Sequence, residues 1–270
     1  MGDRLDGRVA VITGAGQGIG RGVARRFARE GCAIVVAEIN DDSGPETVRQ
    51  VEELGSQAVF LRTDVSDETQ ARACVQAAIS EYGRVDILVN NAWGGAPGGR
   101  IEWHTADQLR RTMDVSFYSG LWTMQEAFPH MKFAGVGSII NLCSLNGVNA
   151  HMYSVAYNTA KEALRTLSRT AAVEWGQYNI RTNVICPAAA SEAYQNYAAA
   201  NPANVAKMLE ENPMRRMGDA ENDIGGAALF LASDDSAYVN GSTLFVSGGT
   251  HINGVSWHPD MPDERPERWG

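Results

Sequence analysis

The sequence predicts an α/β protein with a doubly wound fold, in which helices cover both faces of a seven-stranded parallel sheet. Short runs of β-branched residues alternate with longer helical stretches along the chain. Strand candidates such as "AIVVA" and "SIINL" are continuously apolar, as strands covered on both faces should be. No internal repeat, low-complexity tract or linker divides the 270 residues. We therefore expect a single domain over residues 1–250 and a C-terminal tail over 251–270.

Seven short runs have the composition and length of strands. Helical stretches separate them, so the strands should run parallel, with their carboxyl ends at one edge of the sheet. The ligand crevice of such a sheet lies at that edge. In chain order the runs are Val9–Thr13, Ala33–Ala37, Ala58–Leu61, Asp86–Val89, Ser138–Leu142, Thr182–Cys186 and Thr243–Val246.

Three helical stretches end just before a glycine, the residue that most readily takes the left-handed conformation past a helix end. They are Ile19–Glu30 before Gly31, Pro45–Leu54 before Gly55, and Asp67–Tyr82 before Gly83. Thr105 and Gln108 have the spacing of a capping box, and they should open a long helix that runs towards Met131.

Composition limits the partners and the location of the protein. The net charge of −9 and the pI near 5.1 argue against nucleic acid or an anionic membrane as the main partner. The four cysteines are far apart and form no C-x-x-C pair, which argues against a metal site and suits a reducing compartment. The sequence shows no signal peptide and no apolar run of about 18 residues, so we expect a soluble cytoplasmic protein.

A glycine-rich stretch, "TGAGQGIG" from Thr13 to Gly20, directly follows the first strand and opens a helix. Gly14, Gly18 and Gly20 allow a tight turn in which backbone amides approach a pyrophosphate beside the positive end of the helix. An ordinary turn is the alternative interpretation. The position after the first strand favours the phosphate site.

Glu38 ends the second strand, 18 residues beyond Gly20. A carboxylate at this place can accept hydrogen bonds from both ribose hydroxyls of NAD. It would repel the extra phosphate of NADP, since like charges ~4 Å apart cost about 1 to 4 kcal/mol depending on the local dielectric. Gln17 and Ile39 flank the spot without supplying a basic group. The residue predicts NAD as the cofactor, against the alternative of an ordinary solvated glutamate.

Tyr157 and Lys161 lie four residues apart in "SVAYNTAK" and should share one face of a helix. A phenol has a pKa of about 10 and is a poor base at neutral pH. An ammonium ~4 Å away contributes about 4 kcal/mol at an effective dielectric near 20, enough to lower that pKa by about three. The pair is therefore a candidate general acid/base, although Y-x-x-x-K alone is a weak signal.

Ser144 strengthens this hypothesis because it follows the fifth strand and so reaches the same edge of the sheet. Its hydroxyl can bond the alcohol or carbonyl oxygen on which Tyr157 acts. A Ser-His-Asp hydrolase fits less well, since "LCSLN" is not a G-x-S-x-G elbow.

Together these motifs resemble the short-chain dehydrogenase/reductase superfamily. The resemblance covers roughly residues 5 to 250 and includes "YVNGSTLFVSGG" near the end. Each motif is modest, whereas their order and spacing together are specific. The matching residues are Thr13-Gly14-x3-Gly18-x-Gly20, Asp64-Val65, Asn90-Asn91-Ala92, Ser144, Tyr157-x3-Lys161 and Pro187.

The resemblance implies a Rossmann fold and an NAD(P)-dependent oxidoreductase for alcohols and ketones, commonly a homotetramer. Tyr157 would be the general acid/base. Lys161 would bind the nicotinamide ribose and lower the tyrosine pKa, and Ser144 would orient the substrate oxygen.

It also implies the contacts of the cofactor. Asp64 and Val65 would hold the adenine, Asn91 the adenosine side of the pocket, and Pro187 the nicotinamide face. The full set of expected cofactor contacts is Gly14, Gln17, Gly18, Ile19, Gly20, Glu38, Asp64, Val65, Asn91, Ala92, Tyr157, Lys161, Pro187 and Ala190.

Three positions depart from the family pattern. Trp93 stands where the family has glycine after Asn-Asn-Ala. Ser116 stands where the family has an asparagine that often holds a water in the proton relay, so we expect a relay through an additional water with Ser116 as its catalytic member. Pro187 begins the stretch "PAAASE", which lacks the usual glycine and threonine.

Several residues are candidates for substrate contact. Trp93 begins a glycine-rich loop, Trp93–Arg100, and should narrow the substrate mouth without blocking NAD; a disabled site is the alternative. Residues 189–212 should form a substrate lid. The tail either covers a neighbouring subunit's crevice or is disordered. The substrate candidates are Trp93, Asn146, His151, Tyr153 and Tyr194, against the alternative that these polar and aromatic groups face solvent or core.

The leading hypothesis is an NAD-dependent secondary-alcohol dehydrogenase or ketone reductase, a dimer or tetramer acting on a small, largely apolar or cyclic molecule. A second is a cofactor-binding regulatory or scaffold subunit without turnover, suggested by Trp93 and Ser116. A third, a 3-oxoacyl-carrier reductase, would prefer NADPH, against which Glu38 argues.

Overall fold

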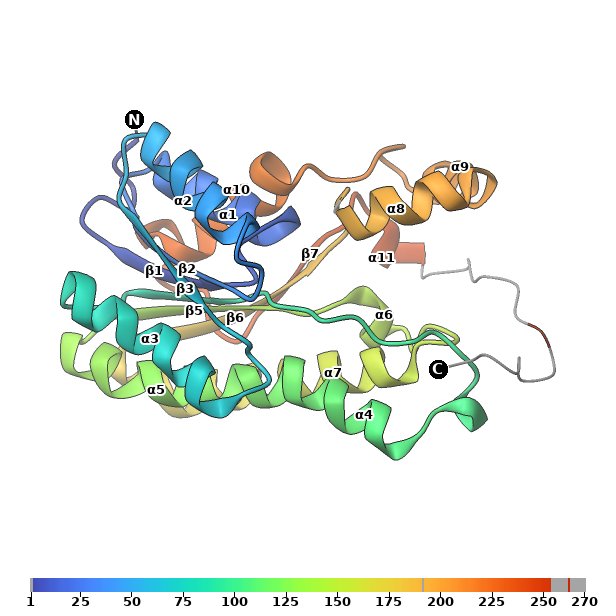
Figure 1. Ribbon diagram of the computed structural model, residues 1–270, viewed down its shortest axis with the longest axis horizontal. Coiled ribbons are helices and arrows are strands. Elements are labelled where there is room, and N and C mark those ends of the chain that lie inside the picture. The colour runs from blue at the N-terminus through green and yellow to red at the C-terminus, as the bar shows by residue number, and fades with distance from the viewer. Residues whose placement is uncertain (1, 191, 254–261, 263–270) are drawn as a thin grey trace.

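The computed structural model describes residues 2–190, 192–253 and Pro262. Seven parallel strands form one sheet in the order β3-β2-β1-β4-β5-β6-β7, with helices on both faces (Figure 1). This confirms the doubly wound α/β fold. The strands are β1 Val9–Thr13, β2 Ala33–Glu38, β3 Ala58–Arg62, β4 Ile87–Asn90, β5 Gly137–Leu142, β6 Ile180–Pro187 and β7 Thr243–Val246.

The helices form two layers. Helices α1, α2 and α10 cover one face of the sheet, and α3, α4, α5 and α7 cover the other (Figure 1). Their bounds are α1 Gly18–Ala28, α2 Ser43–Glu53, α3 Glu68–Tyr82, α4 Ala106–Met113, α5 Ser119–Ala134, α6 Leu145–Val148, α7 Val155–Trp175, α8 Glu192–Ala200, α9 Pro202–Glu211, α10 Gly225–Ala232 and α11 Thr250–Asn253.

Alternate residues of each strand pack into different cores, because successive side chains point to opposite faces of a sheet. Ile12 and Val36 pack with α1 and α10, whereas Val11 and Val35 pack with α3 and α5. All four are fully buried. The continuously apolar strands of the sequence therefore reflect burial on both faces.

The three glycines expected after helices do take positive φ angles: Gly31 at +84°, Gly55 at +86° and Gly83 at +75°. Thr105 and Gln108 form the expected capping box at the start of α4. The long helix towards Met131 is interrupted, however, by a π-helical turn over Asp114–Tyr118 that separates α4 from α5. The apolar periodicity continues across such a turn, so it did not reveal the interruption.

The segment expected as a lid, residues 189–212, forms α8 and α9 on the same side of the sheet as α10 (Figure 1). Of the tail, the structure describes residues 251–253 and Pro262, whose carbonyl accepts a hydrogen bond from Arg100. Trp257 and Trp269, the two tail side chains through which a neighbouring subunit's crevice could be covered, lie outside the described residues. Within the described part of the chain, no helix has both the length and the apolar character needed to cross a bilayer.

Candidate active site

The glycine-rich turn between β1 and α1 has the close packing that only glycine allows. Gly14 and Gly18 have φ angles of +64° and +52°, where side chains are strained. A Cβ at Gly14 would lie 2.8 Å from the Cα of Ala92, and one at Gly20 would collide with the Gly14 carbonyl. The turn therefore forms a backbone cradle beside the N-terminus of α1, which fits a pyrophosphate group.

The two residues that follow β4 brace this cradle from the side. The amides of Asn91 and Ala92 donate to Thr13 Oγ1 at 3.0 and 3.1 Å. The Asn91 side-chain amide donates to the carbonyls of Thr13 and Gly14, both at 3.0 Å. Asn91, expected on the adenosine side of the pocket, thus holds the cradle itself in shape.

Glu38 lies beside the cradle, and only 8% of its surface is exposed. One carboxylate oxygen accepts the amide of Gly16 at 2.9 Å, and the other accepts the amides of Ile39 and Asn40 at 2.9 and 3.1 Å. A fixed negative charge therefore stands at the end of β2, where a ribose would lie. Its surroundings fit a dinucleotide without a phosphate on that ribose.

Arg21 is a basic residue near this place that the sequence did not reveal, because the sequence does not show which way α1 turns its side chains. Its guanidinium donates to the carbonyls of Gly16 and Ser43 and to the Thr47 hydroxyl at 3.0 Å. The charge is therefore used to hold the loop after β2 against the cradle.

The other expected adenosine contacts gather at the same edge. Asp64 follows β3, and its carboxylate accepts the amide and hydroxyl of Ser66 at 3.0 and 2.7 Å. Val65 is buried beside it, with 7% of its surface exposed. Gln17 is exposed and Ile19 half-buried at the start of α1.

A buried polar network joins the strands to the helices behind the site, and sequence reasoning missed it. Asn90 donates to Asn141 at 2.8 Å and accepts from Thr123 of α5 at 2.8 Å. Asn141 donates to Ser168 of α7 at 2.7 Å. The available signal was an asparagine inside each of two apolar strands. The network fixes α7, which carries Tyr157 and Lys161, against the sheet.

The expected catalytic residues meet at the carboxyl edge. Ser144 follows β5, is 8% exposed and accepts the Asn146 amide at 3.1 Å. The side chains of Tyr157 and Ser144 share a hydrogen bond. Lys161 is 4% exposed, and its Nζ donates to the Leu142 carbonyl at 2.8 Å.

Burial controls the ionisation of the pair. It raises the Tyr157 pKa to about 12, and the Ser144 hydrogen bond offsets only part of that effect. Burial also lowers the Lys161 pKa. In the structure the ammonium donates to Leu142 and burial disfavours the phenolate, so the lowering of the tyrosine pKa by Lys161 stays a prediction.

Ser116 lies in the π-helical turn and is 3% exposed. Its hydroxyl is buried without a hydrogen-bond partner in the structure. A buried unpaired hydroxyl is costly, and a bound water is the usual partner for one. This is the environment that an additional relay water would need.

Trp93 lies directly against the catalytic pair. The indole meets the Tyr157 ring edge-on, with centroids 4.6 Å apart at 74°. The Lys161 Nζ is 5.4 Å from the indole centroid. Of the glycines in its loop, Gly95 has a positive φ, at +81°. We expected the ring at the mouth of the substrate pocket. It lies closer than that to Tyr157 and Lys161.

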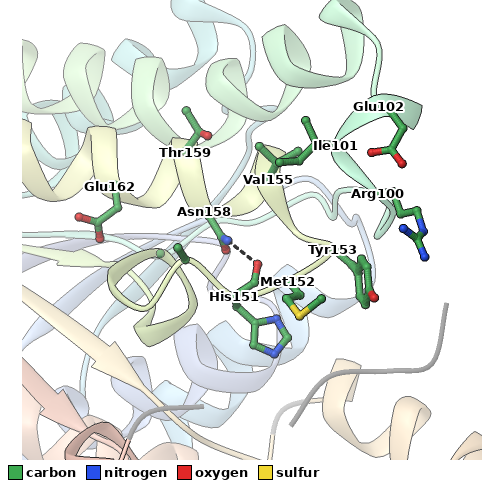
Figure 2. Close-up of a pocket in the computed structure, with 12 residues that line it drawn as sticks. Arg100, Ile101, Glu102, His151, Met152, Tyr153, Val155, Asn158, Thr159 and Glu162 are labelled. Carbon is green, nitrogen blue, oxygen red and sulfur yellow. Dashed lines mark hydrogen bonds between the residues drawn. The ribbon is translucent and has the colours of Figure 1, made fainter. Parts of the chain in front are cut away.

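Two of the expected substrate residues lie elsewhere. His151 and Tyr153 line a cavity of about 570 Å³ between the loop at Arg100 and helix α7 (Figure 2). Asn158 of α7 lines the same cavity and donates to the His151 carbonyl at 2.8 Å. Each residue of a helix is turned by about 100°, so Asn158 and Tyr157 serve different faces of α7. This cavity is beside the catalytic groups and does not contain them.

The remaining site candidates lie at the carboxyl end of β6 or in the segment that follows it. Pro187 ends that strand and is half-buried. Ala190 donates its amide to Gly218 at 2.9 Å. Tyr194 lies on α8, where burial raises its pKa.

The fold and this edge define a class: an α/β oxidoreductase with a dinucleotide cradle next to a serine, a tyrosine and a lysine. The family model described as "Enoyl-(Acyl carrier protein) reductase" matches residues 14–251. The chain belongs to the short-chain dehydrogenase/reductase superfamily. It is an oxidoreductase of the type that acts on secondary alcohols.

Three similar proteins have assigned activities. The chain is 39% identical to a 12alpha-hydroxysteroid dehydrogenase of Clostridium sp., over 91% of this chain and 97% of the relative. It is also 39% identical to the 7alpha-hydroxysteroid dehydrogenase of Escherichia coli K12, over 91% and 95%. A solved 7 alpha-hydroxysteroid dehydrogenase, complexed with NADH and 7-oxo glycochenodeoxycholic acid, matches with a TM-score of 0.87 and 38% identity, over 94% and 96% of the two chains.

Proposed function

We propose that this protein is an NAD-dependent oxidoreductase that interconverts a secondary alcohol and a ketone on a small, largely apolar or cyclic substrate. The observation that carries the proposal is the position of Ser144, Tyr157 and Lys161 at the same sheet edge as the cradle and Glu38.

Tyr157 is the proton-transfer group in this proposal. In oxidation it takes the proton of the substrate hydroxyl, while Ser144 bonds the same oxygen and keeps it in place. Bound NAD supplies the hydride acceptor. Burial raises the Tyr157 pKa, so the reaction needs the positive charge of Lys161 to act on the phenol and favour the phenolate.

Ser116 belongs to the proton relay in this proposal. Its unpaired hydroxyl would bind a water that links the catalytic pair to solvent. Ser116→Asn should leave the rate similar or raise it, since the longer amide restores the family's water ligand. Complete loss of activity with the fold intact would contradict this role.

The substrate class follows from the aromatic group beside Tyr157 and from the relatives. Trp93 offers an apolar ring surface, and the relatives that are 39% identical are named for hydroxysteroids, which carry secondary hydroxyls on alicyclic rings. We expect Asn146 and Tyr194 to contact the substrate from the loop after Ser144 and from the lid. His151 and Tyr153 would contact only a substrate long enough to reach the neighbouring cavity.

Glu38 supports NAD over NADP, and with it an alcohol dehydrogenase over a 3-oxoacyl-carrier reductase. The four free, buried cysteines suit a cytoplasmic protein, and we expect a homodimer or homotetramer. Sedimentation at several concentrations measures that state.

The decisive experiment measures reduction of NAD⁺ with a panel of hydroxysteroids, monocyclic alcohols and linear alcohols. We expect turnover of cyclic substrates, with Tyr157→Phe as the control that lacks the acid/base. Calorimetry measures NAD⁺ binding separately. Tight NAD⁺ binding without turnover of any alcohol or ketone would support the non-catalytic subunit instead.

A further inference from the structure

The indole of Trp93 covers the two side chains that the proposed reaction needs. Its edge-to-face contact with Tyr157 and its position 5.4 Å from the Lys161 Nζ place one side of the ring against the catalytic pair. The side chain is nevertheless among the exposed large hydrophobic groups, with 38% of its surface accessible. The ring therefore stands between the catalytic pair and solvent.

The backbone before Trp93 is held by hydrogen bonds, whereas the backbone after it is open. The preceding residues, Asn91 and Ala92, are bonded to Thr13. Beyond Trp93 the chain forms neither helix nor strand up to Gly98. A Cβ at Gly95 would meet no atom within 4 Å, and one at Gly94 would meet only Val115, at 3.6 Å. The loop that carries the indole is thus open beside Gly95 and in ordinary contact with Val115 beside Gly94.

Both catalytic groups need the space next to the indole. Tyr157 has to reach a substrate oxygen, and Lys161 has to leave or share its bond to Leu142 to reach the nicotinamide ribose that the family's lysine binds. Aromatic and cation–π contacts attach the indole only weakly, so a ligand can displace it.

We infer that Trp93 is a gate over Tyr157 and Lys161. The indole that rests on the pair turns outward when the cofactor binds, and its freed face then receives the apolar ring of the substrate. The inference rests on the proposed function, because it takes NAD as the ligand that opens the gate. It assigns Trp93 one consequence for the cofactor, a lower NAD⁺ affinity than the site would have without the indole, and one for the substrate, a contact surface for its ring.

The first test is NAD⁺ affinity measured by calorimetry, without turnover, for the wild type, Trp93→Ala and Trp93→Phe. Removing the indole removes the contacts that NAD⁺ has to break, so Trp93→Ala should bind NAD⁺ about 5- to 30-fold more tightly. Trp93→Phe should fall between the two. Trp122→Phe, which changes a ring stacked on Tyr118, is the matched control and should match the wild type.

The second test is intrinsic tryptophan fluorescence. NAD⁺ should change the emission of the wild type and of Trp122→Phe. The contribution of the Trp93 indole to that change should be missing in Trp93→Phe. Substrate without cofactor should leave the emission unchanged. Gly95→Ala stiffens the loop at a positive φ and should slow the association of NAD⁺, whereas Gly135→Ala, an equally open positive-φ position after α5, should not.

The outcomes separate the two hypotheses. If the wild type binds no NAD⁺, the proposed function fails. If it binds NAD⁺ but Trp93→Ala binds with the wild-type affinity, the gate is refuted while the function stands. Weaker binding by Trp93→Ala would also refute the gate, because the indole would then be packing on the cofactor.

Discussion

The two sides of the sheet edge differ in how their backbone and side-chain groups are held. On the cofactor side, Glu38 accepts three backbone amides and Thr13 accepts two, although the Ser43 hydroxyl next to Gly16 is buried without a partner. On the reacting side, the Ser116 hydroxyl also has no partner, and Lys161 donates to a main-chain carbonyl. The backbone of the cofactor cradle is therefore preorganised, whereas the reacting groups are left to be arranged by what binds.

The largest expected effect separates chemistry from binding. Tyr157→Phe removes the hydroxyl that exchanges a proton with the substrate oxygen in the proposed reaction. The kcat should therefore fall about 10³-fold or more. NAD⁺ affinity, measured by calorimetry, should stay within about twofold, because the cradle pairs its own groups. A loss of NAD⁺ affinity as large as the fall in kcat would show that cofactor binding depends on the reacting side.

The next effect tests whether the cradle is preorganised by its braces. Asn91→Ala removes the hydrogen bonds to the carbonyls of Thr13 and Gly14, worth about 1 kcal/mol each, so NAD⁺ should bind about 10- to 30-fold more weakly. Asn240→Ala is the control, since its amide braces the Ala172 carbonyl away from the cradle. It should lower the melting temperature and keep NAD⁺ affinity. An unchanged affinity in Asn91→Ala would contradict the bracing role.

A smaller effect concerns the choice of cofactor. Glu38→Ala removes the charge that repels a 2′-phosphate, and the preference for NAD over NADP should fall by about tenfold or more. The ratio of kcat/KM values for the two cofactors measures it. Glu38→Gln keeps an acceptor for the amides and isolates the effect of the charge. A preference that does not change in either variant would remove Glu38 from cofactor selection.

The smallest effect is a change of folding stability with pH, which compares the core next to Ser144 with the core around α3. Burial raises the pKa of Cys143, next to Ser144, and of Cys74, in α3, from 9.0 to about 12. In the unfolded chain these thiols ionise from pH 9, whereas in the folded chain they stay protonated. Stability is therefore present below pH 9 and lost towards pH 12, by about 1.4 kcal/mol per pH unit for each thiol.

Urea unfolding of Cys143→Ala and Cys74→Ala from pH 8 to pH 10.5 checks this slope. Each variant should lose stability less steeply than the wild type above pH 9, by the same amount. A difference seen for Cys74 and not for Cys143 would show that the reacting side admits water to its core.

The sequence was sufficient for the fold because burial on both faces leaves a direct record in continuous apolar strands, and helix ends leave glycines such as Gly31 and Gly83. The glycine cradle followed from its position after β1, and the place of Ser144 followed from its position after β5. Tyr157 followed from its spacing to Lys161 on one helix and from the family resemblance. The contact of Trp93 with Tyr157 did not follow, because a loop side chain is placed by tertiary packing. The Asn90–Asn141 network was missed because the two asparagines, on the neighbouring strands β4 and β5, are 51 residues apart in the sequence.

The hydrogen bonds of Glu38 have a consequence for engineering a change of cofactor. The amides of Gly16, Ile39 and Asn40 all point at one anionic group, which makes this corner an anion receptor whose occupant is part of the chain. Shortening that side chain would uncover three aligned donors at the position that a 2′-phosphate would approach. These three donors would then help to bind NADP, because they already point at one place.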